Sequence, residues 1–254
     1  MIPDQTVDLG VKRTDSGGEP YWQHFDVPVL ETSMSVLDCL IWAQQNSDAS
    51  LAFRCACRVG MCGTCGIRIN GREGLACRTL IRTLTDGDRP AQITVEPMNH
   101  LPVVRDLVTD MTPLHAKIAD ATAENSSGIR LADFVKISPG SRERRAIDPQ
   151  RECIYCGLCY SACSVAGLDE DFLGPAALNR AFVAVADSRS ESSDVILQKV
   201  ATERGLWHCH TLFECTAVCP KDISPALAVQ QMKRKVFRLR LRRLLRLDEN
   251  GSRS

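Results

Sequence analysis

Thirteen cysteines, gathered in two groups, constrain this chain more than any other feature of its sequence. The first group lies between Cys39 and Cys77, and the second lies between Cys153 and Cys219. An odd number of cysteines in a chain of 254 residues does not match the disulfide framework of a small secreted domain. The N-terminal residues show no basic region followed by an apolar core, so no signal peptide is visible. We therefore expect a reducing compartment, with thiolates available to bind metal.

The rest of the composition excludes several classes of protein. The 31 Lys and Arg residues balance the 31 Asp and Glu residues, so no overall charge favours nucleic acid. No apolar run reaches the roughly 18–20 residues that a membrane-spanning helix needs. No paired acid and base residues, phosphate loop or nucleophile constellation is visible, and we expect no catalytic residue on this chain.

The first group contains three cysteines in one short loop and a fourth at a distance. The stretch "CRVGMCGTCGIRINGREGLAC", residues 57–77, has the pattern C-x4-C-x2-C-x11-C. This plant-type spacing predicts a 2Fe–2S cluster with the ligands Cys57, Cys62, Cys65 and Cys77. Converging thiolates require unusual dihedrals and close approach of the backbone, which fits three glycines of the loop, Gly60, Gly63 and Gly66. A structural zinc loop is the alternative, but zinc sites usually present paired C-x2-C knuckles.

Two cysteines of the first group fall outside this spacing. Cys39 lies on the apolar side of a predicted helix, where a small buried hydrophobic residue is the usual interpretation. Cys55 precedes the loop by two residues. We predict that both are structural.

The second group contains a complete bacterial ferredoxin run. The stretch "CIYCGLCYSAC", residues 153–163, has the pattern C-x2-C-x2-C-x3-C, although Ser164 follows it in place of the usual proline. In ferredoxins with two clusters, the fourth cysteine of each run binds the other cluster. Applied to this chain, that rule predicts a 4Fe–4S cluster with the ligands Cys153, Cys156, Cys159 and Cys219.

A second run, "CHTLFECTAVCP" at residues 209–220, lacks one ligand of the pattern. Leu212 occupies the second ligand place. Three thiolates with an apolar side chain at the empty corner suit a 3Fe–4S cluster, and the ligands predicted for it are Cys163, Cys209 and Cys215. The alternative is a degenerate 4Fe–4S site that uses water or another ligand.

The pattern of apolar residues changes between the two cysteine groups. Before residue 120 the pattern predicts a hairpin of two strands, at 7–11 and 25–29, and a helix at 35–46. It predicts two further strands at 67–69 and 93–95. Beyond residue 150 the strand signals disappear, and helices are predicted over 174–187, 192–205 and 224–236. The fold class is therefore α+β, with an N-terminal plant-ferredoxin-like β-grasp domain followed by an all-helical bacterial-ferredoxin-like domain.

Loop formers and charged residues over 120–150 indicate the boundary between these domains. We predict a 2Fe–2S ferredoxin-like domain over residues 1–110 and a connection over 111–150. A helical domain with the 4Fe–4S and 3Fe–4S clusters follows over 151–240, and a basic C-terminal tail occupies 241–254.

The ordered set of three cluster motifs resembles the iron–sulfur subunit of succinate dehydrogenases and fumarate reductases. The resemblance covers nearly the whole chain. Besides the run at 153–163, it includes "VVRDLVTDM" at 103–111, "LDEDFLGPAAL" at 168–178 and "VCPKDISPALAVQQMK" at 218–233. The phrases "GLCYSAC" and "FLGPAA" look like the fumarate-reductase branch, whereas His210 directly after Cys209 is similar to the succinate dehydrogenase pattern. The direction of the reaction stays open.

The resemblance implies a chain that conducts electrons between two partners. A flavoprotein subunit carrying FAD would interconvert succinate and fumarate, and electrons would pass between FAD and a quinone through the three clusters. The quinone would be bound with a membrane anchor subunit, which implies a peripheral location on the cytoplasmic face of the cell membrane. Two rival functions are an iron–sulfur subunit of another flavoenzyme, such as a soluble thiol-dependent fumarate reductase, and a free ferredoxin-like carrier.

The resemblance also places two residues near the quinone headgroup, His210 and Lys233. A hydrogen-bond donor or cation there would stabilise a reduced oxygen. The alternatives are that His210 only fills space beside the cluster and that Lys233 is a solvated helix lysine. The stretch "KRKVFRLRLRRLLRL", residues 233–247, carries eight basic residues. It would rest on anionic lipid or on an acidic anchor surface, or form a solvated basic helix.

Overall fold

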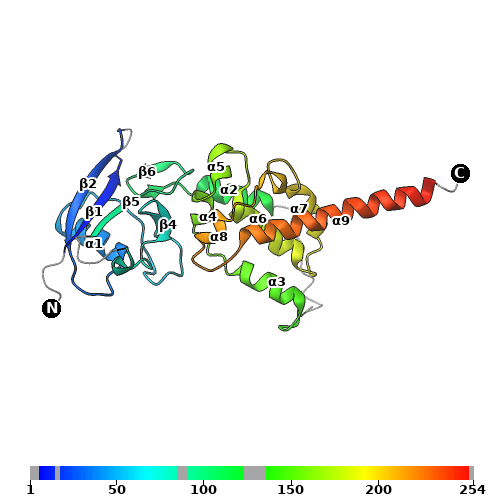
Figure 1. The fold of residues 1–254 in the computed structure, drawn as a ribbon, viewed down its shortest axis with the longest axis horizontal. Coiled ribbons are helices and arrows are strands. Elements are labelled where there is room, and N and C mark those ends of the chain that lie inside the picture. Colours follow the sequence, from blue (N-terminus) through cyan, green and yellow to red (C-terminus); the bar gives the residue numbers. More distant parts are fainter. Residues whose placement is uncertain (1–5, 15–17, 85–90, 123–135, 252–254) are drawn as a thin grey trace. The chain divides into compact units, whose positions relative to one another are not determined.

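The computed structural model describes residues 6–14, 18–84, 91–122 and 136–251 (Figure 1). By its internal contacts the chain divides into two compact units that interleave along the sequence. The first unit contains Met1–Leu114 and two short later segments, Ile154–Ala162 and Val218–Pro220. The second unit contains His115–Cys153, Cys163–Ala217 and Lys221–Ser254.

The first unit is built on a mixed five-stranded sheet (Figure 1). In spatial order its strands are β2 (Tyr21–Pro28), β1 (Thr6–Arg13), β5 (Ala91–Glu96), β3 (Gly66–Ile69) and β4 (Arg72–Leu75). Strand β1 pairs antiparallel with β2 and parallel with β5, and β3 pairs antiparallel with both of its neighbours. The strands expected from Val7 to Val11, and near 25, 67 and 93, are confirmed. Strand β4 was not expected, because it contributes a single buried apolar side chain, Leu75.

Local sequence explains the helix that covers this sheet. Helix α1 (Val36–Asn46) begins where Ser35 accepts the Asp38 N–H, while the Asp38 carboxylate accepts the Ser35 N–H. This reciprocal capping satisfies donors that a helix start leaves unpaired. Its buried residues, among them Val36, Leu40 and Ala43, recur at helical spacing. The unit also holds a short 3-10 turn, a two-stranded hairpin and one helical turn: η1 (Ile81–Thr83), β6 (Val103–Arg105) with β7 (Val108–Thr109), and α4 (Leu158–Ser161).

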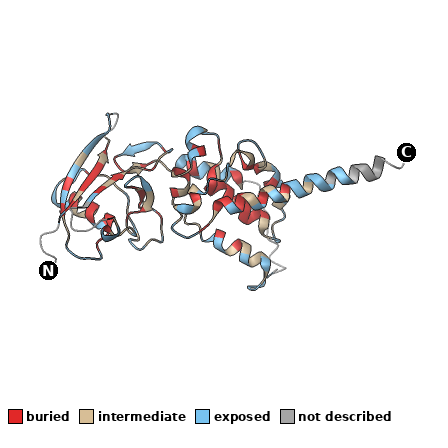
Figure 2. Cartoon of the chain, in the orientation of Figure 1, coloured by how far each residue is buried: buried red, intermediate tan, exposed pale blue. Residues whose placement is uncertain are grey.

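The described residues of the second unit are helical and contain no strand. Its main elements are α3 (Arg142–Arg151), α5 (Ser164–Leu168), α6 (Gly174–Ala186), α7 (Ser193–Val200), η2 (Leu206–His208), α8 (Glu214–Ala217) and α9 (Pro225–Gly251). Helix α2 (Thr112–Ala121) crosses the boundary between the units. Figure 2 shows the core of this unit along α6 and the first half of α9. The helix starts expected at 174, 192 and 224 are confirmed to within one residue, although α7 ends at Val200.

Helix α2 and nearly all of helix α3 lie within residues 111–150, which the sequence analysis assigns to a connection, and the less expected of the two is α3. Its sequence, RERRAIDPQR, is almost entirely polar, and only Ile147 and Gln150 are buried. The helix packs on α6, where the Asn179 amide donates to the Gln150 carbonyl at 3.1 Å. Tertiary packing therefore stabilises a helix whose periodicity alone does not predict it.

No helix of the described part of the chain is both long enough and apolar enough to cross a membrane. Helix α9 has the length, but charged residues interrupt it throughout its second half.

Candidate iron–sulfur cluster sites

All thirteen cysteines lie in described residues, and none of them forms a disulfide. Among the described residues, no three histidine, cysteine or acidic side chains gather as tightly as the ligands of a single metal ion. A cluster distributes its thiolates over several iron atoms, so its ligands can lie further apart. The relevant test is whether the thiols lie where a cluster requires them.

In the loop at residues 57–65, backbone N–H groups point at the Cys57 sulfur. The N–H groups of Met61 and Cys62 each donate to Cys57 Sγ at 3.3 Å. The N–H of Val59 contributes most, and together with the N–H groups of Cys62 and Met61 it lowers the pKa of the Cys57 thiol to about 6. Amides that stabilise a thiolate in this way also stabilise an anionic cluster, so the loop fits the predicted 2Fe–2S site.

Cys65 and Cys77 form a second pair in the same site. Their sulfurs lie 3.3 Å apart, which is near the distance of about 3.8 Å between two thiolates on one tetrahedral metal ion. Burial raises the pKa of the Cys65 thiol to about 12, and binding a metal requires this thiol to lose its proton. The geometry allows these two cysteines to share one iron atom.

Gly63, in the middle of the 2Fe–2S loop, lies directly against Cys156 of the first ferredoxin run. Both residues belong to the first unit. A Cβ added at Gly63 would lie 2.7 Å from the Cβ and 3.0 Å from the Cα of Cys156, and the residue has a φ of +73°. Gly66 also approaches this run, because an added Cβ would lie 3.2 Å from the Cys156 carbonyl oxygen. Gly63 is therefore required both for its backbone conformation and for close packing, and Gly66 for close packing.

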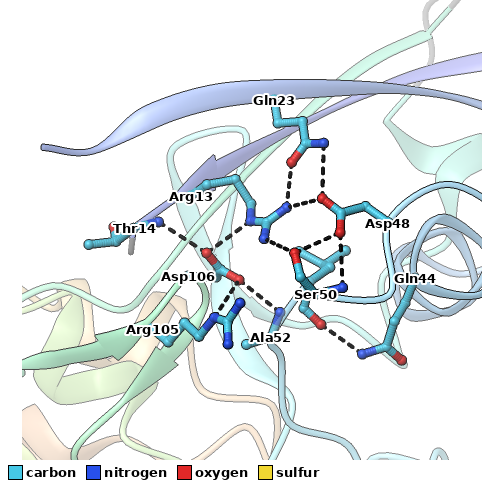
Figure 3. Close-up of polar contacts among 10 residues, drawn as sticks. Arg13, Thr14, Gln23, Gln44, Asp48, Ser50, Ala52, Arg105 and Asp106 are labelled. Atoms are coloured by element: carbon cyan, nitrogen blue, oxygen red, sulfur yellow. Dashed lines mark hydrogen bonds and ion pairs between the residues drawn. The ribbon is translucent and has the colours of Figure 1, made fainter. Parts of the chain in front are cut away.

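A buried ion pair holds the chain segment that leads into the 2Fe–2S loop (Figure 3). Arg13, at the end of β1, is 1% exposed, and its Nε lies 2.9 Å from Oδ1 of Asp106, which is fully buried. The other Asp106 oxygen accepts the N–H of Ala52 at 2.8 Å, and the Leu107 N–H donates to the Ala52 carbonyl. Asp106 and the adjacent Leu107 therefore bind both backbone polar groups of Ala52, shortly before the loop begins.

The guanidinium of Arg13 also contacts three polar side chains, which are Gln23, Asp48 and Ser50. Burial by itself would lower the pKa of Arg13, but the hydrogen bonds to Asp106 and Asp48 outweigh it and leave that pKa raised. Arg13 and Asp106 were not identified from the sequence, where an arginine at the end of a strand carries no signal of burial. Asp106 was only part of the quoted stretch "VVRDLVTDM".

The two ferredoxin runs share one backbone conformation although they differ in one ligand. In the first run the third and fifth residues, Tyr155 and Gly157, have φ values of 54° and 83°. The corresponding residues of the second run, Thr211 and Phe213, both have a φ of 62°. Helices α4 and α8 then begin at the same position of each run. Leu212 is therefore the structural counterpart of Cys156.

In the second unit, three cysteines line one pocket. They are Cys163, Cys209 and Cys215, and Leu212 and His210 lie in the same wall. Burial raises the pKa of Cys215 to about 11 and also raises that of Cys163. The rest of the lining is mainly apolar and includes Phe172, Pro175, Leu178, Ala226 and Val229. The pocket brings together the thiols predicted for the 3Fe–4S cluster, with an apolar side chain at the fourth place.

Ser164, which replaces the usual proline, has a clear role in this unit. Its N–H donates to one carboxylate oxygen of Glu214 at 2.9 Å, and its hydroxyl donates to the other at 2.6 Å. A proline has no N–H and could make neither bond. The pair ties Cys163 to the helical turn that carries Cys215. The sequence prediction noted the missing proline but did not identify Glu214.

The structure places His210 and Lys233 beside the same cluster motif. Lys233 Nζ donates to the Cys209 carbonyl at 2.8 Å, and it lies 5.8 Å from the Trp207 ring centroid. The rings of His210 and His208 meet edge to face with centroids 6.3 Å apart. Lys233 is therefore a partly buried donor and not a fully solvated helix lysine. Trp207 was not identified from the sequence.

Cys39 and Cys55 remain outside these sites. Cys39 is fully buried in α1, and burial raises its pKa to about 12, as expected of a structural thiol. Cys55 is half-buried, and its structural role stays a prediction.

Comparisons with known proteins agree with this geometry. A family model described as a 2Fe-2S iron-sulfur cluster binding domain matches residues 8–116, and a 4Fe-4S dicluster domain matches residues 149–223. The chain is 35% identical to a fumarate reductase iron-sulfur subunit of Mycobacterium tuberculosis, over 96% of this chain and 98% of that protein. It is 32% identical to a mitochondrial succinate dehydrogenase [ubiquinone] iron-sulfur subunit of Dictyostelium discoideum, over 91% of this chain and 82% of that protein.

A solved structure is similar over almost the whole chain as well. It is the Mycobacterium smegmatis Sdh1 complex in the apo form, whose matching chain has a TM-score of 0.72 and 27% sequence identity. The match covers 92% of this chain and 96% of that one. The fold and the sites define an α+β iron–sulfur protein with a 2Fe–2S and a 4Fe–4S domain. The chain belongs to the family of the iron–sulfur subunits of fumarate reductase and succinate dehydrogenase, which are subunits of oxidoreductase complexes.

The buried ion pair yields a first prediction. Arg13→Met removes the close cation of the buried Asp106 carboxylate and leaves only the half-exposed Arg105 at 3.9 Å, so we expect the free energy of unfolding to fall by about 3 kcal/mol. Lys12→Met is the matched control, since Lys12 is the preceding residue of β1 and its ion pair with Glu96 is partly exposed. We expect the control substitution to lower the free energy of unfolding by at most about 1 kcal/mol. Denaturant unfolding, monitored by the loss of visible absorbance, measures the free energy of unfolding of both variants. An equal decrease in the two variants would contradict the role of the ion pair.

The contact of Gly63 with Cys156 yields a second prediction. Gly63→Ala adds a methyl group where only 2.7 Å is available, whereas Gly71→Ala meets only the far end of Arg68 at 4.0 Å. Both glycines have nearly the same positive φ, +73° and +77°, so the strain of about 1–2 kcal/mol is common to both. We expect only Gly63→Ala to lose bound iron, measured as iron per chain after purification without oxygen. Equal iron content in both variants would show that the contact does not matter.

Proposed function

We propose that this chain is the electron-transfer subunit of a membrane-bound succinate dehydrogenase or fumarate reductase, with three iron–sulfur clusters in series. The observation that supports the proposal best is the packing of Gly63 against Cys156, because it joins the loop proposed for the 2Fe–2S cluster to a residue proposed as a ligand of the next cluster. Electron transfer through clusters in series requires neighbouring clusters to lie close together. The mixed sheet with its covering helix supports a β-grasp domain of the plant-ferredoxin type, and the paired runs support a bacterial-ferredoxin-like domain.

The proposed ligands follow the motif spacing. In the 2Fe–2S site, Cys65 and Cys77 share one iron, as their separation of 3.3 Å supports, and Cys57 and Cys62 hold the other. The 4Fe–4S cluster is assigned to Cys153, Cys156, Cys159 and Cys219 by the rule that the fourth cysteine of a run serves the other cluster.

The third cluster is proposed as 3Fe–4S, held by Cys163, Cys209 and Cys215. The residues on either side of Leu212 have positive φ, as do the residues on either side of Cys156. The second run therefore has the backbone of a run with all its cysteine ligands, but Leu212 replaces one of them. An apolar side chain offers no bond to a fourth iron.

The chemistry of succinate and fumarate belongs, in this proposal, to a partner flavoprotein that carries FAD. The relatives are named as iron–sulfur subunits of fumarate reductase and succinate dehydrogenase, and one name includes ubiquinone. A quinone and a membrane anchor subunit are proposed at the 3Fe–4S end, which places the chain at the cytoplasmic face of the cell membrane. Electrons then pass one at a time between FAD and quinone in either direction.

At the quinone end, Lys233 and His210 are proposed to stabilise charge on the headgroup. Lys233 is already oriented by its bond to the Cys209 carbonyl, so it is a donor held at the cluster motif. Trp207 flanks it and packs beneath Arg240, whose Cζ lies 5.4 Å from the ring centroid. A cation held in place beside a ring can stabilise an anionic oxygen without reorganising.

The proposed function is tested by what purifies with the chain. Affinity purification from membranes should recover a flavoprotein with bound FAD, and the complex should oxidise succinate or reduce fumarate with a quinone as partner. Recovery of a different flavoenzyme, or of the chain alone with no activity towards either dicarboxylate, would contradict the proposal.

The quinone end yields a third prediction, with a control on the same helix. Lys233→Gln should slow quinone turnover by roughly tenfold or more, because it removes the cation. Lys235→Gln should not, since Lys235 donates to the Val185 carbonyl instead of to the cluster motif. Electron transfer from succinate to an artificial acceptor should stay unchanged in both variants. If Lys233→Gln slows both reactions equally, the residue supports the cluster or the assembly.

The vacant ligand place yields a fourth prediction. Leu212→Cys puts a thiol in a run whose backbone already matches the complete one, so the site should accept a fourth iron. In the oxidised protein the paramagnetic signal of the 3Fe–4S cluster should disappear, while bound iron rises by about one atom per chain. Leu168→Cys, on an exposed leucine outside the run, is the control and should change neither. A 3Fe–4S signal that persists in Leu212→Cys would mean that Leu212 does not face the open corner.

A further inference from the structure

Most apolar side chains of helix α9 are buried up to Val236, and several beyond it are exposed. Its first half is packed into the second unit through buried apolar side chains, which include Ala228, Val229, Met232 and Val236. Beyond that point large apolar side chains lie in solvent: Phe237 is 65% exposed, Leu241 44%, Leu244 61% and Leu245 57%. Figure 2 shows the exposed colour along this part of the helix.

These four side chains form one stripe. Their spacing of four, seven and eight residues from Phe237 is that of a single helix face. Isolated exposed apolar residues are common on protein surfaces, but a stripe of this kind marks a surface that contacts something apolar. The described part of the chain leaves the stripe uncovered.

The charges beside the stripe are all of one sign. Residues 233–247 contain eight Lys and Arg residues and no Asp or Glu. At about 100° per residue, Arg238 and Arg242 lie about 100° and about 140° from Phe237 around the helix, along the edge of the stripe next to Leu245. Arginines four residues apart, such as Arg234, Arg238 and Arg242, repel one another and weaken an isolated helix. An anionic surface would remove this repulsion, and an apolar surface would cover the stripe.

An anionic lipid bilayer supplies both. Its acyl boundary takes up a leucine and phenylalanine stripe, and its headgroups attract the arginines, at about 1 kcal/mol for each residue near the surface. A partner helix would have to bring a large excess of acidic residues to the same place. The segment is too short and too charged to cross the bilayer, so it would lie in the plane of its surface.

We infer that residues 234–247 of α9 form an amphipathic helix that binds the surface of an anionic membrane directly. Phe237, Leu241, Leu244 and Leu245 enter the interface, and Arg238 and Arg242 contact lipid phosphates. This binding does not depend on the quinone residues or on the identity of the partner flavoprotein, and it adds a direct lipid contact to the attachment through an anchor subunit.

The test uses the full chain with its clusters, purified without oxygen and mixed with vesicles. Wild type should sediment with vesicles of phosphatidylcholine and phosphatidylglycerol but not with phosphatidylcholine alone, and binding should weaken as salt rises. Leu241→Asp/Leu244→Asp should weaken binding at least tenfold, and Arg238→Gln/Arg242→Gln roughly tenfold. Val195→Asp, on an exposed valine of α7, is the control and should bind as wild type does.

Iron content and circular dichroism check that each variant keeps its clusters and its helix. Failure of wild type to sediment with anionic vesicles at low salt would overturn the inference, as would variants that bind equally well. If wild type does not bind vesicles but the leucine variant fails to assemble with a membrane subunit, the stripe contacts protein and the inference is wrong. Activity of the assembled complex is measured separately, so either proposal can fail without the other.

Discussion

Short loops that present several thiols to one cluster need backbone conformations that most residues avoid, and this constraint organises the whole chain. The 2Fe–2S loop meets it with Gly60 and Gly63, both at positive φ. The second ferredoxin run meets it with Thr211 and Phe213, which pay about 1–2 kcal/mol each to adopt the left-handed region. Such strain persists only where the surrounding structure enforces it. In the second unit, that support includes the Ser164–Glu214 pair and the packing of α9.

The same constraint explains why the cluster loops are so firmly supported. Asp106 holds the backbone at Ala52 from the hairpin of β6 and β7, and Arg13 neutralises its charge from the end of β1. Gly63 then lies in contact with Cys156. Electron transfer between clusters benefits from such rigid, close packing, because a small displacement of either loop changes the distance between the centres.

Cysteine spacing was enough to predict which thiols would lie together, whereas no local pattern predicted the contacts that support them. The spacing of cysteines in a motif reflects the geometry of the cluster that they bind. The structure agrees with the motifs at two points: Cys65 lies next to Cys77, and one pocket contains Cys163, Cys209 and Cys215. Alternating apolar residues predicted β1 and β5, and Ser35 predicted the start of α1. Helix α3 and the roles of Arg13 and Glu214 were missed. Each depends on tertiary contacts between distant segments, which no local pattern contains.

The central claim is that one chain carries three different clusters, of which the last lacks one iron. Iron analysis combined with paramagnetic resonance, on protein purified without oxygen, tests it most directly. The account predicts about nine iron atoms per chain. It also predicts a 3Fe–4S signal in the oxidised protein, and 2Fe–2S and 4Fe–4S signals after reduction. About ten irons without a 3Fe–4S signal, an iron content near two, or zinc in place of iron would contradict it.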